Sequence, residues 1–209
     1  RRIATQGISS PLVGRDVEFV AMKGCVNRLL DGQGGILSII GEAGLGKSRL
    51  MAELRNSTIA DNTSLQWLEG HTLSYGQKIS YWPFREIVRQ YAGITDDDSV
   101  TEAWEKLKAD VSQLFASEAE EILPFIASLA TLDIKDEYAS RIRNFDGEAM
   151  GRHVFLSSRQ FFERLAQVRP LILVFEDLHW ADDSSTLLLE HLLPLVFRVP
   201  ILLCGVSRP

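Results

Sequence analysis

Cysteines are scarce in this chain, and the two that are present, Cys25 and Cys204, stand far apart in its 209 residues. Neither has neighbours with the spacing of metal ligands, so we interpret both as reduced packing residues of a protein from a reducing compartment. Apolar runs of the roughly 20 residues needed to cross a bilayer are also lacking, and residues 1–6 have no apolar stretch of a signal peptide. These absences predict a cytoplasmic protein without a membrane partner.

The chain also has no excess of positively charged residues. Lys and Arg number 22 against 28 Asp and Glu, which gives a net charge of -6 and argues against direct binding of nucleic acid. The acidic residues concentrate between positions 95 and 150, where fourteen acids stand against five bases. That stretch is either a docking surface for a partner or the solvated face of a helical subdomain, and both interpretations stay open.

Short apolar segments divide the chain. Four of them, residues 36–40, 65–68, 171–175 and 201–204, are too short for helices and lack the alternation of half-exposed strands. Stretches with helical periodicity separate them, as expected for parallel strands that are covered on both faces. The pattern predicts a doubly wound α/β fold, and a length of 209 residues fits a single domain.

Helical patterns dominate between the second and third of these segments. Pro83 stands where a first helical turn would begin, and two capping boxes follow, Ser99 with Glu102 and Ser117 with Glu120. We therefore predict an all-helical insertion over residues 82–147, followed by a helix over residues 148–168 that leads to the third strand. The other parts of the domain are an N-terminal segment (8–35), a first core unit (36–70) and a second core unit (148–209).

A glycine-rich loop directly follows the first apolar segment. Residues 41–48 match the phosphate-loop pattern Gly-x4-Gly-Lys-Ser/Thr between a strand and a helix. The glycines let the backbone approach a phosphate group closely, so that N–H groups and the helix N-terminus point at the anion. Lys47 would contact the β- and γ-phosphates of a nucleotide, and the Ser48 hydroxyl would ligate Mg²⁺. The predicted contacts are Gly41, Glu42, Ala43, Gly44, Leu45, Gly46, Lys47, Ser48 and Arg49.

Two adjacent carboxylates end the third apolar segment. Glu176 and Asp177 follow five apolar residues, and strand alternation would turn one of the two acids toward the buried side of the sheet. We predict that Glu176 serves the Mg²⁺ ion and that Asp177 polarises an attacking water, with Lys47 completing the catalytic group.

Arg208 and the histidines are less specific signals. Arg208 follows the fourth segment and is either a sensor of the γ-phosphate or an exposed side chain. The histidines show no metal-site spacing and no serine or cysteine partner, and we interpret them as structural; they are His71, His153, His179 and His191.

Together these residues resemble the nucleotide-binding domain of the STAND class of signal-transduction ATPases, relatives of AAA+ proteins. The resemblance is to the version found beside class III adenylate/guanylate cyclase domains and in large bacterial regulators. It covers nearly the whole chain and rests on Leu12-Val13-Gly14-Arg15-Asp16, the phosphate loop, Ser74-Tyr75-Gly76, Tyr81-Trp82-Pro83-Phe84, Glu176-Asp177-Leu178-His179-Trp180-Ala181-Asp182 and Ser207-Arg208-Pro209.

This resemblance implies a three-layer αβα sandwich of the ASCE type of P-loop NTPase, with ATP or ADP and Mg²⁺ bound. It implies that Val13, Gly14 and Arg15 lie against the adenine and ribose, and it assigns Arg208 to the γ-phosphate. The first of the two adjacent carboxylates is more often Asp in this class. With Glu at position 176, the assignment of the metal role to Glu176 and of the base role to Asp177 is less clear-cut. The class continues into a helical lid, so the resemblance implies an excised domain whose partners are the lid and effector parts of one longer chain. Association with further copies is left open.

Three functions fit these residues. The first, which we expect, is a regulatory switch that binds ATP and hydrolyses it slowly with Mg²⁺, in a protein with a cyclase or transcriptional effector. The second is a scaffold that holds nucleotide without cleaving it, which the intact Lys47, Ser48, Glu176 and Asp177 argue against. The third is a small-molecule kinase with its acceptor site in the helical insertion, although acids followed by His179 and Trp180 suit activation of water better.

Overall fold

The computed structural model describes residues 14–61, 64–72, 79–135, 138–139, 142–143 and 145–209. Its centre is a parallel four-stranded sheet with the strand order β1-β4-β3-β2. All four predicted strands are present, namely β1 (Gly35–Ile40), β2 (Gln66–His71), β3 (Leu171–Glu176) and β4 (Ile201–Ser207). Because the strands are parallel, their carboxyl ends meet along one edge of the sheet, and residues that follow different strands are brought together there.

Strand β2 differs most from its prediction. We expected it over residues 65–68, but it begins one residue later and continues through Glu69, Gly70 and His71. The register pairs these last three residues with Val174, Phe175 and Glu176 of β3. The predicted end of the strand was wrong because it followed hydrophobicity, whereas the backbone ladder to β3 continues after the apolar run stops.

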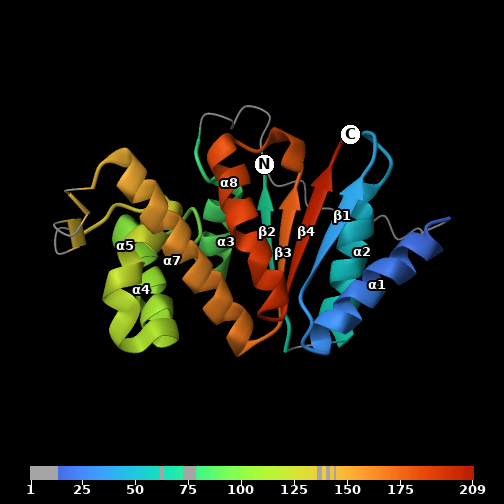
Figure 1. The fold of residues 1–209 in the computed structure, drawn as a ribbon, viewed down its shortest axis with the longest axis horizontal. Coiled ribbons are helices and arrows are strands. Elements are labelled where there is room, and N and C mark those ends of the chain that lie inside the picture. The colour runs from blue at the N-terminus through green and yellow to red at the C-terminus, as the bar shows by residue number, and fades with distance from the viewer. Residues whose placement is uncertain (1–13, 62–63, 73–78, 136–137, 140–141, 144) are drawn as a thin grey trace.

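Helices cover both faces of the sheet, as Figure 1 shows. The helices α1 (Asp16–Leu30) and α2 (Lys47–Asp61) pack on one face, where Ile172 and Val174 of β3 join their buried side chains. The helices α3 (Trp82–Tyr91), α7 (Gly147–Val168) and α8 (Asp183–Leu192) pack on the other face with Leu173 and Phe175. Neighbouring residues of β3 thus serve opposite cores, which confirms the three-layer α/β arrangement.

The described part of the predicted insertion is helical. It begins with α3 and continues with α4 (Val100–Phe115), the 3₁₀ turn η1 (Ala116–Glu118) and α5 (Ala119–Leu129); α4 and α5 lie in the left part of Figure 1 beside α7. Ser99 and Glu102 form the predicted capping box, with Glu102 N donating to Ser99 Oγ at 3.2 Å and Ser99 N donating to Glu102 Oε2 at 2.9 Å. The second predicted box, Ser117 with Glu120, was wrong. Ser117 lies inside η1, because the chain turns at Ala116 with φ of 48° and enters α5 without a side-chain cap.

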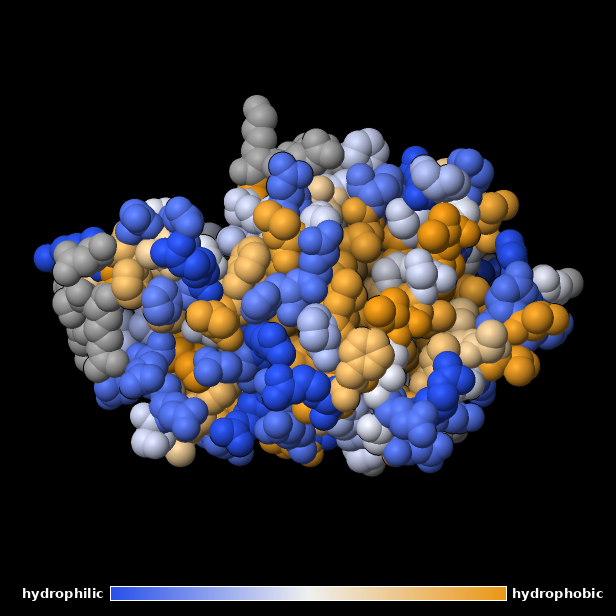
Figure 2. Space-filling model, viewed as in Figure 1, coloured by the Kyte–Doolittle hydropathy of each residue, from blue (hydrophilic) through white to orange (hydrophobic). Residues whose placement is uncertain are grey.

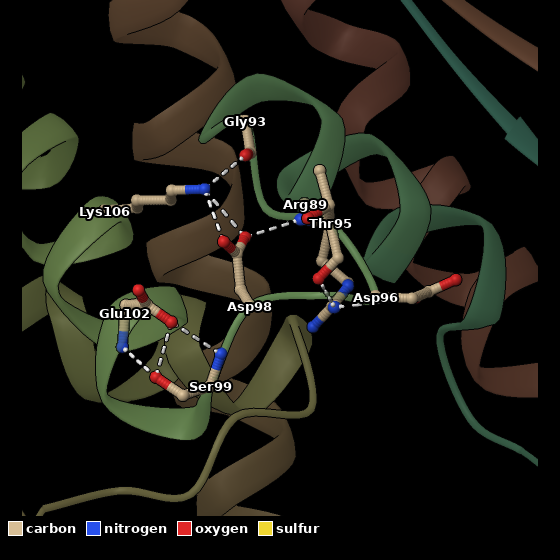
Figure 3. Close-up of polar contacts among 8 residues, drawn as sticks. All are labelled: Arg89, Gly93, Thr95, Asp96, Asp98, Ser99, Glu102 and Lys106. Atoms are coloured by element: carbon tan, nitrogen blue, oxygen red, sulfur yellow. Dashed lines mark hydrogen bonds and ion pairs between the residues drawn. The ribbon is translucent and has the colours of Figure 1, made fainter.

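The loop between α3 and α4 is held by the charges drawn in Figure 3. Lys106 Nζ contacts both carboxylate oxygens of Asp98 at 2.7 and 2.8 Å and the carbonyl of Gly93 at 3.0 Å. Asp98 also accepts from the backbone N–H of Thr95 at 2.7 Å. The hydrogen bond from Lys106 lowers the pKa of Asp98. Part of the acidic stretch therefore stabilises the start of α4.

The helix α3 lies close to the end of β2. A Cβ atom at Gly70 would overlap the carbonyl of Pro83, so only glycine allows this approach. Pro83 occupies the first turn of α3, as predicted. Two side chains of α3 accept hydrogen bonds from the strand. Glu69 N donates to Gln90 Oε1 and His71 N donates to Glu86 Oε2, both at 2.7 Å. These side chains satisfy N–H groups that an edge strand would otherwise leave exposed.

Two further 3₁₀ turns lie in the last part of the chain. The 3₁₀ turn η2 (Leu178–Trp180) follows β3, and η3 (Leu193–Phe197) leads from α8 toward β4. Asp182 caps α8 by accepting from Ser185 N at 2.9 Å. Within the ranges given above, none of the helices has both the length and the apolar character to cross a bilayer.

Candidate functional site

The phosphate loop connects β1 to α2 at the carboxyl edge of the sheet. Gly44 and Gly46 have φ of 82° and 78°, a left-handed conformation that side chains with a Cβ rarely adopt. At Gly41 the constraint is steric, because a Cβ atom would lie 3.3 Å from the side chain of Leu45. The helix α2 begins directly after Gly46, so its N-terminal N–H groups face the hollow of the loop. The predicted strand, loop and helix are thus present in that order.

Lys47 folds over this loop. Its Nζ donates to the carbonyl of Gly41 at 2.6 Å and to the carbonyl of Glu42 at 2.9 Å. The ammonium group is therefore held at the loop by two neutral carbonyl acceptors. A bound phosphate would accept a stronger hydrogen bond from it, because the phosphate is charged. The other predicted contacts, Glu42, Ala43, Leu45 and Arg49, are exposed on the same segment.

Ser48 and Glu176 meet although 128 residues separate them in the chain. Ser48 Oγ donates to Glu176 Oε2 at 3.1 Å, so the first turn of α2 touches the end of β3. A hydroxyl and a carboxylate are oxygen donors of the kind that Mg²⁺ prefers, and that ion usually completes its shell with water and phosphate. In the described ranges no three His, Cys, Asp or Glu side chains form a metal cluster. The pair therefore fits a Mg²⁺ ion bound together with a phosphate.

Asp177 lies beyond the strand rather than in it. Its φ of 56° is left-handed, and it precedes the turn η2. We expected alternation to bury one of the two acids, and this expectation was wrong, because β3 ends at Glu176 and Asp177 is exposed. Glu176 thus ends the strand, whereas Asp177 begins the turn into η2.

Thr72 holds this acidic turn and was missed in the sequence analysis. It follows β2, and its backbone N–H donates to the carbonyl of Glu176 at 3.0 Å. Its Oγ1 lies 3.2 Å from the same carbonyl and also donates to the carbonyl of Asp177. The signal that could have found Thr72 is the register of β2 with β3, which hydrophobicity does not reveal.

His71 was predicted to be structural, but it lies at the site. It pairs in register with Glu176, and its Nδ1 is 3.2 Å from Glu86 Oε2. The hydrogen bond to Glu86 raises the pKa of His71, although burial acts in the opposite direction. Burial by itself would raise the pKa of Glu86, but the bonds from His71 lower it overall.

A cavity of about 330 Å³ lies between α1, β1 and the phosphate loop. Its lining includes Arg15, Glu18, Met22, Ile39, Leu45 and Leu50. The Arg15 side chain links two parts of this lining, with Nη1 2.7 Å from Glu18 Oε1 and Nη2 3.4 Å from the carbonyl of Leu45. Gly14 beside it has φ of 74°, and Val13 lies outside the described residues, as do Ser74, Tyr75 and Gly76. Figure 2 shows hydrophobic side chains over β1 and α1. Ile36 and Ile40 of β1 and Val17 and Val20 of α1 are exposed.

Arg208 is brought to the loop by the backbone. Ser207 is the last residue of β4 and pairs in register with Ile40 of β1. The carbonyl of Ser207 accepts from Gly41 N at 3.3 Å, so the end of β4 is tied to the first residue of the loop. Arg208 follows directly and is exposed. The strand that ends before Arg208 is thus a neighbour of the strand that leads into the phosphate loop.

The remaining histidines lie among aromatic rings. His153 stacks between Phe125 and Phe145, with ring centroids 4.9 and 4.5 Å away. His191 lies 5.6 Å from the ring of Phe155, and His179 lies 5.1 Å from the ring of Trp180. These contacts agree with the structural interpretation for His153 and His191. His179 is the exception in position, because it follows the acidic turn by two residues.

The fold and the site together define a class: an α/β nucleotide-binding domain with a phosphate loop after β1 and carboxylates after β3. The profile of the AAA ATPase domain matches residues 11–204, and the chain belongs to this family. It is therefore a nucleotide-binding domain of the ATPase kind, and its fold is that of a P-loop NTPase.

Among curated proteins, the chain is similar to an uncharacterized protein of Rhizobium meliloti (strain 1021). The two sequences are 26% identical over 208 residues, which is 97% of this chain and 19% of the relative. The chain thus spans about a fifth of the length of that protein.

Proposed function

We propose that this chain is a regulatory domain that binds ATP and ADP and hydrolyses ATP slowly with Mg²⁺. The observation that carries the proposal is the contact of Ser48 Oγ with Glu176 Oε2, 3.1 Å apart and directly beside a glycine loop. A loop that only bound an anion would need neither the hydroxyl nor the carboxylate. Together they supply what a divalent ion on a polyphosphate requires.

The phosphate loop holds the polyphosphate in this proposal. The N–H groups of residues 41–48 and Lys47 Nζ contact the β- and γ-phosphates, and Arg49 follows them in the first turn of α2. Ser48 and Glu176 hold Mg²⁺, which withdraws charge from the phosphate oxygens. The nucleoside enters the cavity that Arg15 lines. The proposal also assigns Val13 and Gly14, which precede Arg15 in the sequence, to the adenine and ribose.

Asp177 orients and polarises the attacking water. Its exposed carboxylate follows Glu176 by one residue but leaves the strand in another direction, so the same segment can serve the metal and the water. Thr72 supports this role because its N–H and hydroxyl bond the carbonyls of Glu176 and Asp177, which directly precede η2.

A switch needs a group that distinguishes ATP from ADP, and Arg208 has this role in the proposal. Its position directly after Ser207, which bonds the first residue of the loop, supports contact with the γ-phosphate. Only a difference in affinity between two arrangements can shift their populations, so lid and effector parts of a longer chain would read the nucleotide state. An effector of the cyclase or transcriptional kind, with cytoplasmic location, completes the proposal.

Slow hydrolysis of ATP follows from the small number of cationic side chains at the γ-phosphate. An additional arginine supplied to the γ-phosphate by a partner is worth about 10³–10⁵ in rate for this kind of reaction. Beside Mg²⁺, the proposal assigns two cationic side chains to that phosphate, Lys47 and Arg208. Basal hydrolysis is then too slow for metabolic turnover but suits a timed switch.

Calorimetric titration with ATP, with and without Mg²⁺, tests the proposal, with Lys47→Ala beside the parent and phosphate release followed in the same samples. We expect binding by the parent alone, accompanied by slow release. Equal affinity of Lys47→Ala would overturn the assignment of the loop. Binding without release, in this chain and in a longer one, would favour the scaffold. Transfer of phosphate to a small acceptor in place of water would favour the kinase.

A further inference from the structure

The edge of β2 is sealed by two side chains of α3 that are four residues apart. Successive edge N–H groups of a strand are about 6.8 Å apart, because they belong to every second residue. Residues four apart in a helix are about 6 Å apart along its axis. Glu86 and Gln90 match this spacing and accept from His71 N and Glu69 N, both at 2.7 Å. The two bonds fix α3 in register with β2.

Glu86 makes a further contact that Gln90 does not make. The same oxygen, Oε2, that accepts from His71 N also lies 3.2 Å from His71 Nδ1. Glu86 therefore holds the imidazole as well as the backbone, whereas the bond from Glu69 to Gln90 holds backbone alone. The imidazole is half exposed, so packing alone does not fix its orientation.

The held imidazole stands next to the candidate metal carboxylate. His71 and Glu176 are register partners on adjacent parallel strands, so both side chains leave the sheet on the same face. Strand spacing is about 4.8 Å, which puts the two side chains within reach of each other. Glu86 of α3 thus contacts His71 of β2, His71 is the register neighbour of Glu176 of β3, and Glu176 contacts Ser48 of α2.

We infer that Glu86 is a positioning residue for the metal site: it holds His71 against Glu176 and so sets how well Glu176 and Ser48 bind Mg²⁺ with the nucleotide. This inference rests on the proposed function. Groups that orient a ligating side chain from behind contribute about 10- to 100-fold to metal affinity. Because Glu86 belongs to α3, the inference also couples the first helix of the insertion to the metal site.

The test is the Mg²⁺ concentration that half-saturates the binding of ATP, measured by calorimetry, which does not depend on turnover. We expect this concentration to rise about tenfold in Glu86→Ala. In Glu86→Gln it should rise less, because the amide oxygen still accepts from His71 N. The matched control is Gln90→Ala, which removes the neighbouring edge bond and should leave the Mg²⁺ requirement unchanged. Affinity for ATP without Mg²⁺ should stay constant in all three variants.

A double-mutant cycle separates positioning from a merely structural role. If Glu86 acts through His71, then Glu86→Ala should cause little further change in a His71→Gln background. Additive effects, or equal effects of Glu86→Ala and Gln90→Ala, would overturn the inference, as would an unchanged Mg²⁺ requirement in both Glu86 variants. If Glu86→Ala does not fold, Glu86→Gln and the His71→Gln background decide. A parent that binds ATP with no response to Mg²⁺ would instead refute the proposed function.

Discussion

Ser48 donates a hydrogen bond to Glu176 across the carboxyl edge of the sheet, with 3.1 Å between Oγ and Oε2. The strand order explains how they meet, because β4 alone separates β1, which leads into the loop, from β3. The crossing places α2 and its first hydroxyl over the end of β3. The contact therefore depends on the sheet as a whole rather than on either segment.

Removing the hydroxyl tests this pair. Ser48→Ala should raise the Mg²⁺ concentration needed for ATP binding by at least about tenfold, since losing a ligand costs no less than losing a group that orients one. Calorimetry at several Mg²⁺ concentrations measures this. Affinity for ATP in the presence of a chelator should match that of the parent, and a loss there would mean that Ser48 contacts phosphate rather than metal.

The role of Asp177 in hydrolysis can be tested separately from ATP binding. Asp177→Asn should bind ATP as the parent does and lose hydrolysis by about 10²–10⁴, the usual contribution of a positioned base. Phosphate release under single-turnover conditions measures the loss. Glu176→Gln is the matched comparison, because it should weaken binding with Mg²⁺ as well as hydrolysis. Equal turnover by Asp177→Asn and the parent would assign the base to another residue.

Arg15 borders the cavity far from the γ-phosphate end in this proposal. Arg15→Ala should weaken ATP and ADP by the same factor, about fivefold, which corresponds to roughly 1 kcal/mol for a lost polar contact. Parallel titrations with the two nucleotides give the ratio. A loss of affinity for ATP alone would instead assign Arg15 to the γ-phosphate. It would contradict the proposed contact of Arg15 with the nucleoside.

Gly70 tests the approach of α3 to β2. Gly70→Ala should lower the free energy of unfolding by about 1–3 kcal/mol or more, because the new methyl group meets backbone that cannot move freely. Urea unfolding measures this change. Gly147→Ala is the control, since a Cβ atom at this first residue of α7 meets nothing within 4 Å. A Gly70→Ala chain as stable as the control would contradict the close packing.

The charges in front of α4 predict a dependence on pH. Lys106 lowers the pKa of Asp98 and Ser99 lowers the pKa of Glu102, so both acids stabilise the fold when ionised. This stabilisation is complete above the unfolded pKa values of about 4 and disappears as the pH falls through the lower folded values. Asp98→Asn should therefore be less stable than the parent at pH 7, and the difference should shrink in acid. Asp97→Asn, at an exposed position, is the matched control and should leave the stability at pH 7 nearly unchanged.

Sequence patterns were sufficient where one physical effect dominates. The centre of each strand follows from apolar runs such as Leu171–Phe175, and the loop follows from glycines that backbone geometry requires. The capping box at Ser99 is local, and it was predicted correctly for this reason. The box at Ser117 matched the same pattern but lies in a 3₁₀ turn, since the path of the chain from α4 overrides local preference there.

The polar end of β2 could not be predicted in the same way. Glu69 and His71 are residue types that do not indicate a strand. Their backbone N–H groups bond Gln90 and Glu86 of α3, and the sequence does not show that α3 packs beside this strand. Without this register, His71 and Thr72 had no visible relation to Glu176. The part of the candidate site that comes from β2 and α3 is thus a product of tertiary structure.

The two apolar cores described above differ in extent, and the phosphate loop belongs to the lesser one. In the described residues, the core under α1 and α2 contains fewer buried side chains than the core that joins α3, α7 and α8 to the insertion. Layers with fewer buried contacts open locally at a lower cost than global unfolding. A ligand that binds only the closed layer suppresses this opening. Nucleotide binding should therefore act on the layer with fewer buried side chains, and its expected effect is to reduce the local opening of α1 and α2.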